Sequence, residues 1–524
     1  MSDDYLGAGG RLTGGPADAL VRAGYEHEIG QARRLAPWLS LADLAHAVAL
    51  VEGGAVGGED AQGLLEGLLA LDAIPADEFP WRAELGDAFN SREHELKARV
   101  GASAAGWLSA GRPRREAFRV ALRLRARDGS LDLHDAALDL AAAVVAQARR
   151  HAGDLAADYT YLQPAQPTTI GHLLLAHAYP ALRDAERLWL SHGWLDASVA
   201  GVGGSAGSRW PLDRERLADL LGCGVVMTHA KDAMWQTDGY ATLIAAVATA
   251  ATHGAQLGQD LEILASQEFA AVELADHHSR ASALMPQKRN PYALAVIRTQ
   301  AGIAAGDLAA ALVTLHTGSA RTDHFHLLNG SVPRLLDEAV AVMRLAAEVV
   351  AQMTIAPARW ERAAREGFTA AADVADVLAV EAGLDYRTAH HVVGRAVRAL
   401  LDEGLSPDAL TPERLAEAAR ETVGHAVEIS AAALADAPDP AACAAARPQT
   451  GPSAPAQVAA PIAHRAEPIG AARAPSAAAR HRAARAQSEL RPPAADLARH
   501  LRPCCLAPGP PPACPVDAPA HRAP

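Results

Sequence analysis

One stretch decides how the rest of the sequence is interpreted: Ser279-Arg280-Ala281-Ser282-Ala283-Leu284-Met285-Pro286-Gln287-Lys288-Arg289-Asn290-Pro291. Pro286 and Pro291 disfavour the helical region for the residues before them, so this stretch is predicted to be a loop. Apolar helical repeats flank it on both sides, which is where a mobile active-site loop would be hinged. It gathers a serine, a cation and an amide on one segment. An ordinary proline-rich connection with a solvated lysine is the alternative.

The whole string resembles the signature loop of the fumarase/aspartase superfamily, G-S-S-x-M-P-x-K-x-N-P. It is most similar to the argininosuccinate lyase form, S-S-L-M-P-Q-K-K-N-P. Ser282 takes the place of the first serine, six residues before Lys288, and Asn290 takes that of the asparagine. Ala281 and Ala283 replace the glycine and the second serine. The resemblance implies an enzyme that eliminates a leaving group from a succinyl-type small molecule and releases fumarate.

Roles for three loop residues follow from this resemblance. Ser282 would be the general base that takes a proton from the carbon next to a carboxylate. Lys288 would neutralise the charge that develops, and Asn290 would donate a hydrogen bond to a substrate carboxylate. Serine is a weak base unless a closed loop holds it deprotonated among donors, so loop closure and chemistry must be coupled. No cofactor and no catalytic metal are expected.

The family's Y-T-H-L-Q-x-A-Q-P motif has a counterpart in Tyr159-Thr160-Tyr161-Leu162-Gln163-Pro164-Ala165-Gln166-Pro167. Thr160 and Gln163 match and are expected to bind substrate. The family's histidine, assigned to acid–base work or to substrate binding, is Tyr161 here. A phenol with a pKa near 10 cannot accept and return a proton at pH 7 as imidazole does. Either a neighbouring arginine such as Arg115 lowers the pKa of Tyr161 so that it acts as the acid, or Tyr161 takes no part because the leaving group departs without protonation. A third interpretation is simple variation at a structural position.

A third stretch, Leu108 to Glu116, is similar to the family's L-H-T-G-R-S-R-N-D. Arg112 and Arg114 are in register with the family's arginines, and Arg114 is a candidate fork for a carboxylate. Arg115 replaces an asparagine that contacts substrate in argininosuccinate lyases. We expect all three arginines to bind substrate. By this comparison the fumarate end of the site is retained, whereas the leaving-group end is altered.

Other departures also fall in the expected pocket. Leu39 and Asp43 stand where the family has an aspartate and a serine that contact substrate, and Phe89 replaces a histidine. The Arg321-Thr322-Asp323 segment lacks the family's tyrosine. Two hypotheses therefore stand: an active argininosuccinate lyase-like enzyme with an altered leaving group, arginine itself remaining possible, or a non-catalytic structural or binding homologue of the same fold.

The composition narrows the class of protein. Half of the 524 residues are hydrophobic but only 4% are aromatic, which favours closely packed helices built from Ala, Leu and Val. The formal charge of −13 argues against nucleic acid as a partner. The five cysteines form no paired framework, which suits a reducing cytoplasm; a zinc site in the tail, from Cys504, Cys505, Cys514 and His500, is the alternative. No signal peptide and no membrane span are expected.

The predicted fold class is all-α, with four regions. An N-terminal helical domain covers residues 1–105, a central long-helix bundle covers 106–355, and a small C-terminal helical domain covers 356–461. Residues 462–524 are rich in proline, alanine and arginine, and a disordered tail is predicted there. The resemblance implies a homotetramer in which long helices form a joint bundle and each active site draws on three subunits.

Overall fold

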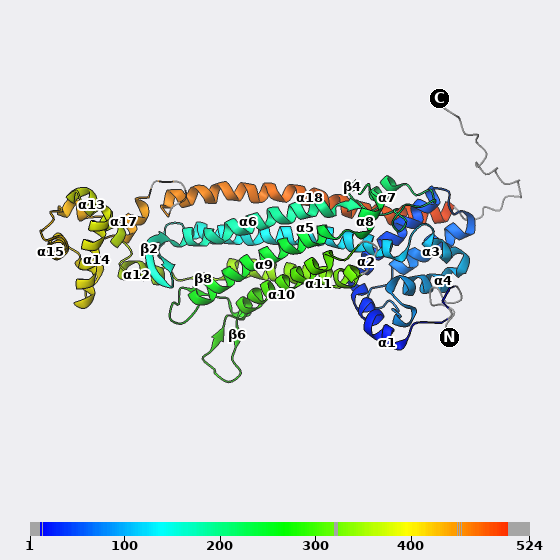
Figure 1. Ribbon diagram of the computed structural model, residues 1–524, viewed down its shortest axis with the longest axis horizontal. Coiled ribbons are helices and arrows are strands. Elements are labelled where there is room, and N and C mark those ends of the chain that lie inside the picture. The colour runs from blue at the N-terminus through cyan, green and yellow to red at the C-terminus, as the bar shows by residue number, and fades with distance from the viewer. Residues whose placement is uncertain are drawn as a thin grey trace, which may run out of the picture.

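The computed structural model describes residues 11, 12, 14–318, 323–447, 449, 451 and 453–500. The molecule is elongated and almost entirely helical, which confirms the predicted fold class (Figure 1). Long parallel and antiparallel helices fill its middle, and a group of shorter helices lies at each end. This arrangement places functional segments far from one another along the long axis.

Five helices form the central bundle. They are α5 (Arg114–Arg150), α6 (Ile170–Leu195), α9 (Asp238–Leu264), α10 (Tyr292–Leu315) and α11 (Asp323–Gln352). Helix α5 packs against α6 and α11, and α9 packs against α10. Gly129 allows the close approach of α11, since a Cβ there would lie 2.8 Å from the Leu336 side chain. The core is built largely from Ala, Leu and Val, as the composition predicted.

The N-terminal region joins this core. Its elements are α1 (Asp18–Leu20), η1 (Val21–Tyr25), α2 (Glu26–Glu52), α3 (Gly58–Asp72), η2 (Ala83–Leu85), α4 (Ala88–Gly106) and η3 (Trp107–Ser109). Leu35, Leu39 and Leu44 of α2 are fully buried in the same hydrophobic cluster as the bundle helices. The first region and the bundle therefore share one hydrophobic interior.

The strands are short and occur in pairs. Strand β1 (Leu155–Thr160) is antiparallel to β2 (Gln163–Thr169), and β6 (Arg280–Ala281) is antiparallel to β7 (Arg289–Asn290). The other two pairs are β3 (Ala197–Ser198) with β4 (Val225–Val226) and β5 (Val272–Glu273) with β8 (Thr354–Ile355). Helices α7 (Arg214–Leu220) and α8 (Ala230–Trp235) and the turn η4 (Asp276–His278) complete the connections.

The C-terminal helices have a core of their own. The elements are α12 (Pro357–Glu366), α13 (Ala371–Ala382), α14 (Tyr386–Asp402), η5 (Pro407–Ala409), α15 (Pro412–Val423), α16 (Ala431–Leu434) and α17 (Pro440–Ala445). Leu378, Leu400 and Leu415 are fully buried in this second cluster. It lies at the end of the molecule opposite the N-terminal helices (Figure 1).

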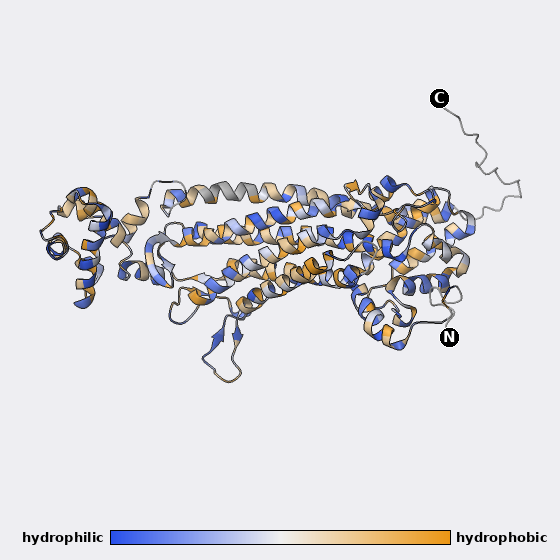
Figure 2. Ribbon diagram, viewed as in Figure 1, coloured by the Kyte–Doolittle hydropathy of each residue, from blue (hydrophilic) through white to orange (hydrophobic). Residues whose placement is uncertain are grey.

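Two segments among the described residues are long and apolar enough to cross a membrane by length and composition. The segment Asp18–Glu52 is mostly buried inside the protein, with 78% of its apolar window covered, as expected of a core helix. The helix α10 is different, because only 22% of its apolar window is buried. Apolar residues recur along its ribbon (Figure 2) and leave an exposed apolar face on the bundle.

The tail differs from the expectation of disorder. Residues 455–500 form a single helix, α18 (Pro455–His500), which runs along the bundle (Figure 1), and residues 501–524 lie outside the described residues. The prolines disfavour a helix interior, but alanine is the best helix former and the arginines find partners. Docking onto the folded chain offsets the cost of the prolines.

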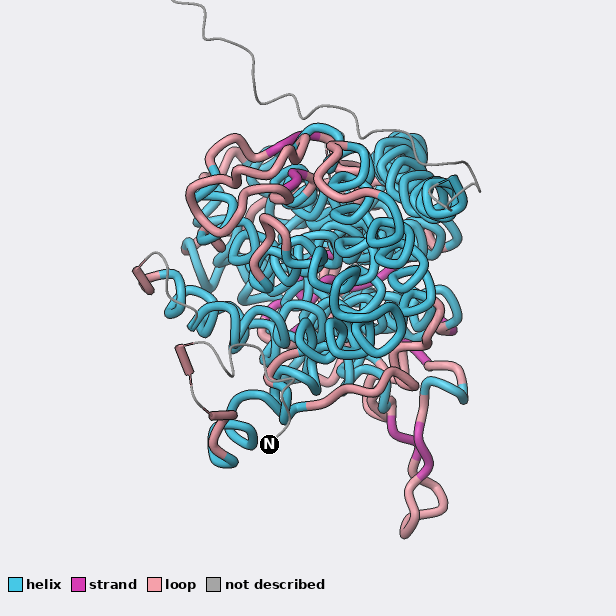
Figure 3. The backbone as a smooth tube through the Cα atoms, turned by 90° about the vertical axis from the view of Figure 1, so that its right-hand side faces the viewer, coloured by secondary structure: helices cyan, strands magenta, loops and turns pink. Residues whose placement is uncertain are grey.

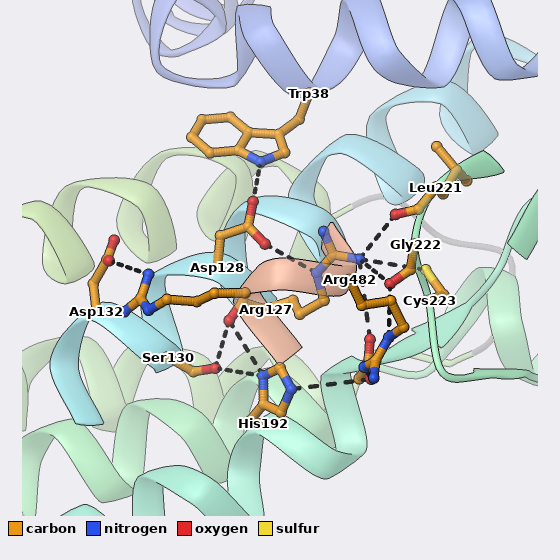
Figure 4. Close-up of polar contacts among 12 residues, drawn as sticks. Trp38, Arg127, Asp128, Ser130, Asp132, His192, Leu221, Gly222, Cys223 and Arg482 are labelled. Carbon is orange, nitrogen blue, oxygen red and sulfur yellow. Dashed lines mark hydrogen bonds and ion pairs between the residues drawn. The ribbon is translucent and has the colours of Figure 1, made fainter. Parts of the chain in front are cut away.

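Arginines anchor α18 to α3, to α5 and to the C-terminal end of α6. They pair with carboxylates as follows: Arg473 with Asp139 at 2.6 Å, Arg480 with Asp132 at 2.8 Å and Asp135 at 3.0 Å, Arg491 with Asp72 at 2.6 Å, and Arg482 with Asp196. Gly222 permits the contact, since a Cβ there would lie 2.8 Å from the Cβ of Ala486. Figure 4 shows Arg482 beside the Leu221–Cys223 turn and the buried Arg127.

We predict that α18 stays docked in solution and protects its arginines from trypsin. The Leu490 side chain is 1% exposed, so Leu490→Ala should destabilise the docked helix by about 2–5 kcal/mol and accelerate tryptic cleavage within residues 455–500. Gln487→Ala, on the same helix, is the matched control. Rapid cleavage of the unmodified protein at Arg480 and Arg482 would show that the helix is not docked.

Candidate active site

The stretch Ser279 to Pro291 forms a hairpin that projects from the bundle (Figures 1 and 3). The arms β6 and β7 pair Arg280 with Asn290 and Ala281 with Arg289, and the tip between them is irregular, as predicted. The Ser282 amide donates to the Lys288 carbonyl at 3.3 Å, which places both residues at the base of the tip. Lys288 is exposed. The hairpin therefore holds these side chains away from the helical bundle of its own chain.

The Ser282 hydroxyl lies among backbone donors. Its Oγ accepts hydrogen bonds from the amides of Leu284 at 3.3 Å and Met285 at 3.0 Å. Donors aimed at an oxygen favour its negatively charged form. The Asn290 amide donates to the Arg280 carbonyl at 2.9 Å, so this side chain holds the two arms together.

Tyr161 lies at a strained turn. The β1–β2 register pairs Thr160 with Gln163, which leaves Tyr161 and Leu162 as a two-residue turn with φ of 53° and 59°. Left-handed φ values at both positions are typical of a type I′ hairpin, which usually contains Asn or Gly. The Tyr161 residue is 100% exposed. A strained backbone that displays a side chain completely is a feature of functional segments. Thr160 and Gln163 are exposed beside it.

The arginines divide into two groups. The Arg112 side chain is 2% exposed, and its guanidinium donates to Asp43 at 2.6 Å and to the Ala42 carbonyl at 3.1 Å. Asp43 also binds Arg92 at 2.8 Å. Because Arg112 is buried and already paired in this network, the expectation that it binds substrate does not fit the structure. Arg112 instead holds in place the segment that carries Arg114.

Arg114 and Arg115 line a cavity of about 260 Å³. Its walls come from α1, η1, α2, the N-cap of α4, α5 and α11, and they include Glu28, Asp87 and His326. The Arg114 Nη1 lies 3.3 Å from the Asp87 carboxylate, and the Glu28 carboxylate lies 3.1 Å from His326 Nδ1. In this cavity two predicted site residues, Arg114 and Arg115, meet further charged groups.

Burial governs the pKa values in this cavity. Desolvation raises the pKa of Asp87, although Arg114 opposes the shift. Desolvation and then the charge of Asp87 raise the pKa of Glu28, with His326 and Arg114 acting in the opposite direction. Desolvation, followed by the charge of Arg114, lowers the pKa of Arg115. Ionisable groups in a cavity whose pKa values are shifted by desolvation and by neighbouring charges are typical of functional sites.

A single chain does not assemble the predicted site. Arg114 is the first residue of α5, which has 37 residues, and β1 begins just beyond its other end. At a rise of 1.5 Å per residue, α5 separates Arg114 from the Tyr161 turn by about 55 Å. The predicted pairing of Arg115 with Tyr161 is therefore absent within one chain. The replaced segment at Arg321 and Thr322 lies outside the described residues.

Sequence reasoning did not find Glu28 or His326. Both lie on long helices, α2 and α11, and about 300 positions separate them. Their proximity depends on α2 and α11 packing together. Asp87 belongs to a segment compared with the family, but its pairing with Arg114 is visible only in three dimensions.

Comparisons with known proteins identify the relatives of this chain. A family model described as lyase matches residues 58–306, and one described as argininosuccinate lyase C-terminal matches residues 368–443. An argininosuccinate lyase from Halobacterium salinarum is 34% identical over 457 residues, which is 86% of this chain and 90% of that protein. Another from Frankia casuarinae is 34% identical over 392 residues, 74% of this chain and 83% of that protein.

Solved structures share the fold. An EDDS lyase in complex with formate matches with a TM-score of 0.82 and 24% identity, covering 96% of this chain and 99% of that one. A variant of EDDS lyase with bound fumarate has a TM-score of 0.81 and 25% identity, covering 96% of this chain and 98% of that one. The 4% not covered is about 21 of 524 residues, so the match includes much of the 46-residue α18.

We predict that His324, behind the cavity, makes stability depend on pH. Burial, followed by the charge of Arg119, lowers its pKa from 6.5 to about 4. Below pH 6.5 His324 becomes protonated in the unfolded chain but stays neutral in the folded one. Its contribution to the free energy of unfolding is therefore complete above pH 6.5 and is lost as the pH falls toward 4. Denaturant unfolding at several pH values should give a shallower decline for His324→Phe than for the unmodified protein. The exposed His390→Phe is the control, and an unchanged slope in His324→Phe would contradict the assignment.

Proposed function

Because this chain belongs to the argininosuccinate lyase family, and is thus a carbon–nitrogen lyase, we propose that it splits an N-substituted aspartate with Ser282 as the base. The products would be fumarate and a nitrogen compound. The observation that carries this proposal is the setting of Ser282, whose oxygen receives two backbone amides on a projecting hairpin. The bound fumarate in a structure of the same fold supports the product.

The chemistry requires stabilisation of a dianion. When Ser282 removes a proton from the carbon next to a carboxylate, the electron pair moves into that carboxylate. Lys288, also on the hairpin, supplies the compensating cation. The carbon–nitrogen bond then breaks, and its electron pair leaves with the nitrogen. Asn290, Thr160 and Gln163 are proposed to orient the substrate, and Arg114 to hold the other carboxylate as a fork.

The site is proposed to form between subunits of a homotetramer. Arg114, the Tyr161 turn and the signature hairpin cannot meet within one chain, because α5 holds the first two about 55 Å apart. The exposed apolar face of α10, including Ile303, Leu312 and Val313, supports helix packing between chains. Exposed apolar surface of this kind marks a protein interface.

The leaving group is proposed to be something other than arginine. Tyr161 replaces the family's histidine, and Arg115 can tune it only across a subunit boundary. Either Tyr161 acts as such a tuned acid, or the leaving nitrogen obtains its proton elsewhere or needs none. We therefore expect weak cleavage of argininosuccinate, at least about a hundredfold below a typical family member.

We predict fumarate formation, followed by its ultraviolet absorbance, from a member of a panel of N-substituted aspartates. Ser282→Ala should lower the turnover by about 10²- to 10⁴-fold, the contribution of a general base, with assembly and melting temperature unchanged. Lys288→Met should have a similar effect, because the dianion loses its cation. Ser279→Ala is the matched control, since that hydroxyl donates to the Ala275 carbonyl at 3.2 Å instead.

Two results would redirect the proposal. Full turnover in Ser282→Ala would exclude this serine as the base. Absence of fumarate from every compound in the panel would favour the second candidate, a non-catalytic binding homologue, which the loss of the histidine at position 161 also suggests.

We predict a tetramer by light scattering, dissociated by charge on the α10 face. Leu312 and Val313 are 54% and 65% exposed in a single chain, so Leu312→Asp with Val313→Asp costs little in a monomer but buries charge in an assembly. Activity should fall with the dissociation, because each site needs several chains. Leu401→Asp, at a residue 58% exposed on α14, is the control. A stable, fully active monomer would contradict the shared site.

A further inference from the structure

A pair of histidines lies at the neck of the hairpin that carries Ser282. The turn η4 ends in His277 and His278, and Ser282 follows four residues after the second. The two imidazole rings are neighbours, with their centroids 4.3 Å apart. Glu348, near the C-terminal end of α11, completes the group. Each of the three side chains offers one ligand atom, and these atoms lie within 4.8 Å of one another. Two imidazoles and a carboxylate from distant parts of the chain therefore converge at the base of the hairpin.

The His278 side chain is buried without a hydrogen bond. It is 3% exposed, and its Nδ1 has no hydrogen-bond partner among the described residues. Its Nε2 lies 3.7 Å from the Glu348 Oε1, which is too long for a hydrogen bond. A buried polar atom without a partner costs about 1–3 kcal/mol, and most buried side-chain polar atoms have one. The position of this imidazole is therefore not explained by a structural hydrogen bond, and the ring is free to bind a ligand.

The other two members of the group are open to solvent. His277 is exposed, and the Glu348 side chain is 54% exposed, so an ion can reach both. The Glu348 Oε1 accepts a hydrogen bond from Gln352 Nε2 at 3.2 Å, one helical turn further along α11. Hydrogen bonds of this kind commonly orient the ligands of metal ions. The group thus combines one fixed, buried imidazole with two side chains that can adjust to an incoming ion.

We propose that His277, His278 and Glu348 bind a divalent transition metal of the zinc type, and that the bound ion ties the neck of the hairpin to α11. Imidazole nitrogen and carboxylate oxygen are zinc ligands, whereas magnesium and calcium prefer ligand sets made of oxygen. Bonds of about 2.0–2.1 Å in a tetrahedral site bring ligand atoms to about 3.4 Å from one another. Small rotations of the exposed His277 and Glu348 side chains are enough to close the site.

The neck is where such an ion would restrain the hairpin. Arg289, on the returning arm β7, lies 2.9 Å from Asp276 and 2.6 Å from Glu273, so the returning arm is already held to the neck. His278 and Glu348, by contrast, stop short of a hydrogen bond between η4 and α11. A shared metal ion would supply that connection. The site is separate from the groups proposed to act in the elimination, so metal binding can be measured without any substrate.

The test measures metal binding by the untagged full-length protein. Titration calorimetry with Zn²⁺ should show one high-affinity site per chain, and Co²⁺ should give the visible absorption of a four-coordinate ion at the same stoichiometry. Glu348→Gln and His277→Asn should each weaken Zn²⁺ binding by at least about a hundredfold, the upper end of what even an outer-shell partner contributes. Both positions are exposed, so the melting temperature and the oligomeric state without metal should match the unmodified protein.

Two control proteins address other sources of zinc binding. His390 and His391 are a second adjacent pair, exposed on α14, and His390→Asn with His391→Asn should leave the Zn²⁺ affinity unchanged. Cys504→Ser, Cys505→Ser and Cys514→Ser together should also leave it unchanged, since these cysteines belong to the alternative zinc site that the sequence allows in the tail.

Hydrogen exchange measures the effect on the hairpin. At a free Zn²⁺ concentration ten times Kd, amides in residues 276–291 that exchange only when the neck separates from α11 should exchange about tenfold more slowly. The same concentration should have no effect on these residues in Glu348→Gln.

Each part of the proposal has an outcome that would overturn it. Absence of Zn²⁺ binding, binding that survives Glu348→Gln, or binding that disappears with the three cysteines would exclude the site. Mg²⁺ bound as tightly as Zn²⁺ would exclude the class of metal. Zn²⁺ bound at the site without slower exchange in residues 276–291 would exclude the restraint on the hairpin. None of these results depends on whether the protein releases fumarate.

Discussion

The length of α5 is the constraint on which the rest of the molecule depends. Its 37 residues form one helix that begins at Arg114 and ends just before the β1–β2 hairpin. A helix of this length separates its ends by about 55 Å, and no loop movement shortens it. One folded chain therefore presents incomplete functional surfaces at a distance from one another. The same rigidity underlies the proposal that the site forms between chains, because antiparallel packing of long helices can bring the ends of different chains together.

Buried charge determines which arginines remain for function. Asp43 lies between Arg92 and Arg112, and all three side chains are almost fully buried. Removal of one partner from such a group leaves an uncompensated charge inside the protein, at a cost of about 3–5 kcal/mol. Arg112 is thereby committed to the scaffold, where it holds the start of α5 in place. Arg114 and Arg115, the first two residues of α5, are the residues that face the cavity.

Ion pairs between arginines and carboxylates also hold the helix α18 against the outside of the bundle. The protein is acidic overall, with a formal charge of −13, and α18 places arginines against carboxylates of α3, α5 and the end of α6. Each surface pair is weak alone, but buried Leu490 and Ala494 and the close contact at Gly222 add apolar packing. The helix thereby links the N-terminal elements α2 and α3 to the bundle.

The sequence by itself determined the helical class, the family and the loop that carries Ser282, Lys288 and Asn290. These depend on local patterns: apolar periodicity, proline positions and an ordered motif. It also indicated Arg114 and the departure at Tyr161. The tertiary structure alone decided that Arg112 is buried against Asp43, that the tail docks as a helix, and that Glu28 meets His326 beside Arg115. These are contacts between residues far apart in the chain, and they follow from how helices pack, which no local pattern records.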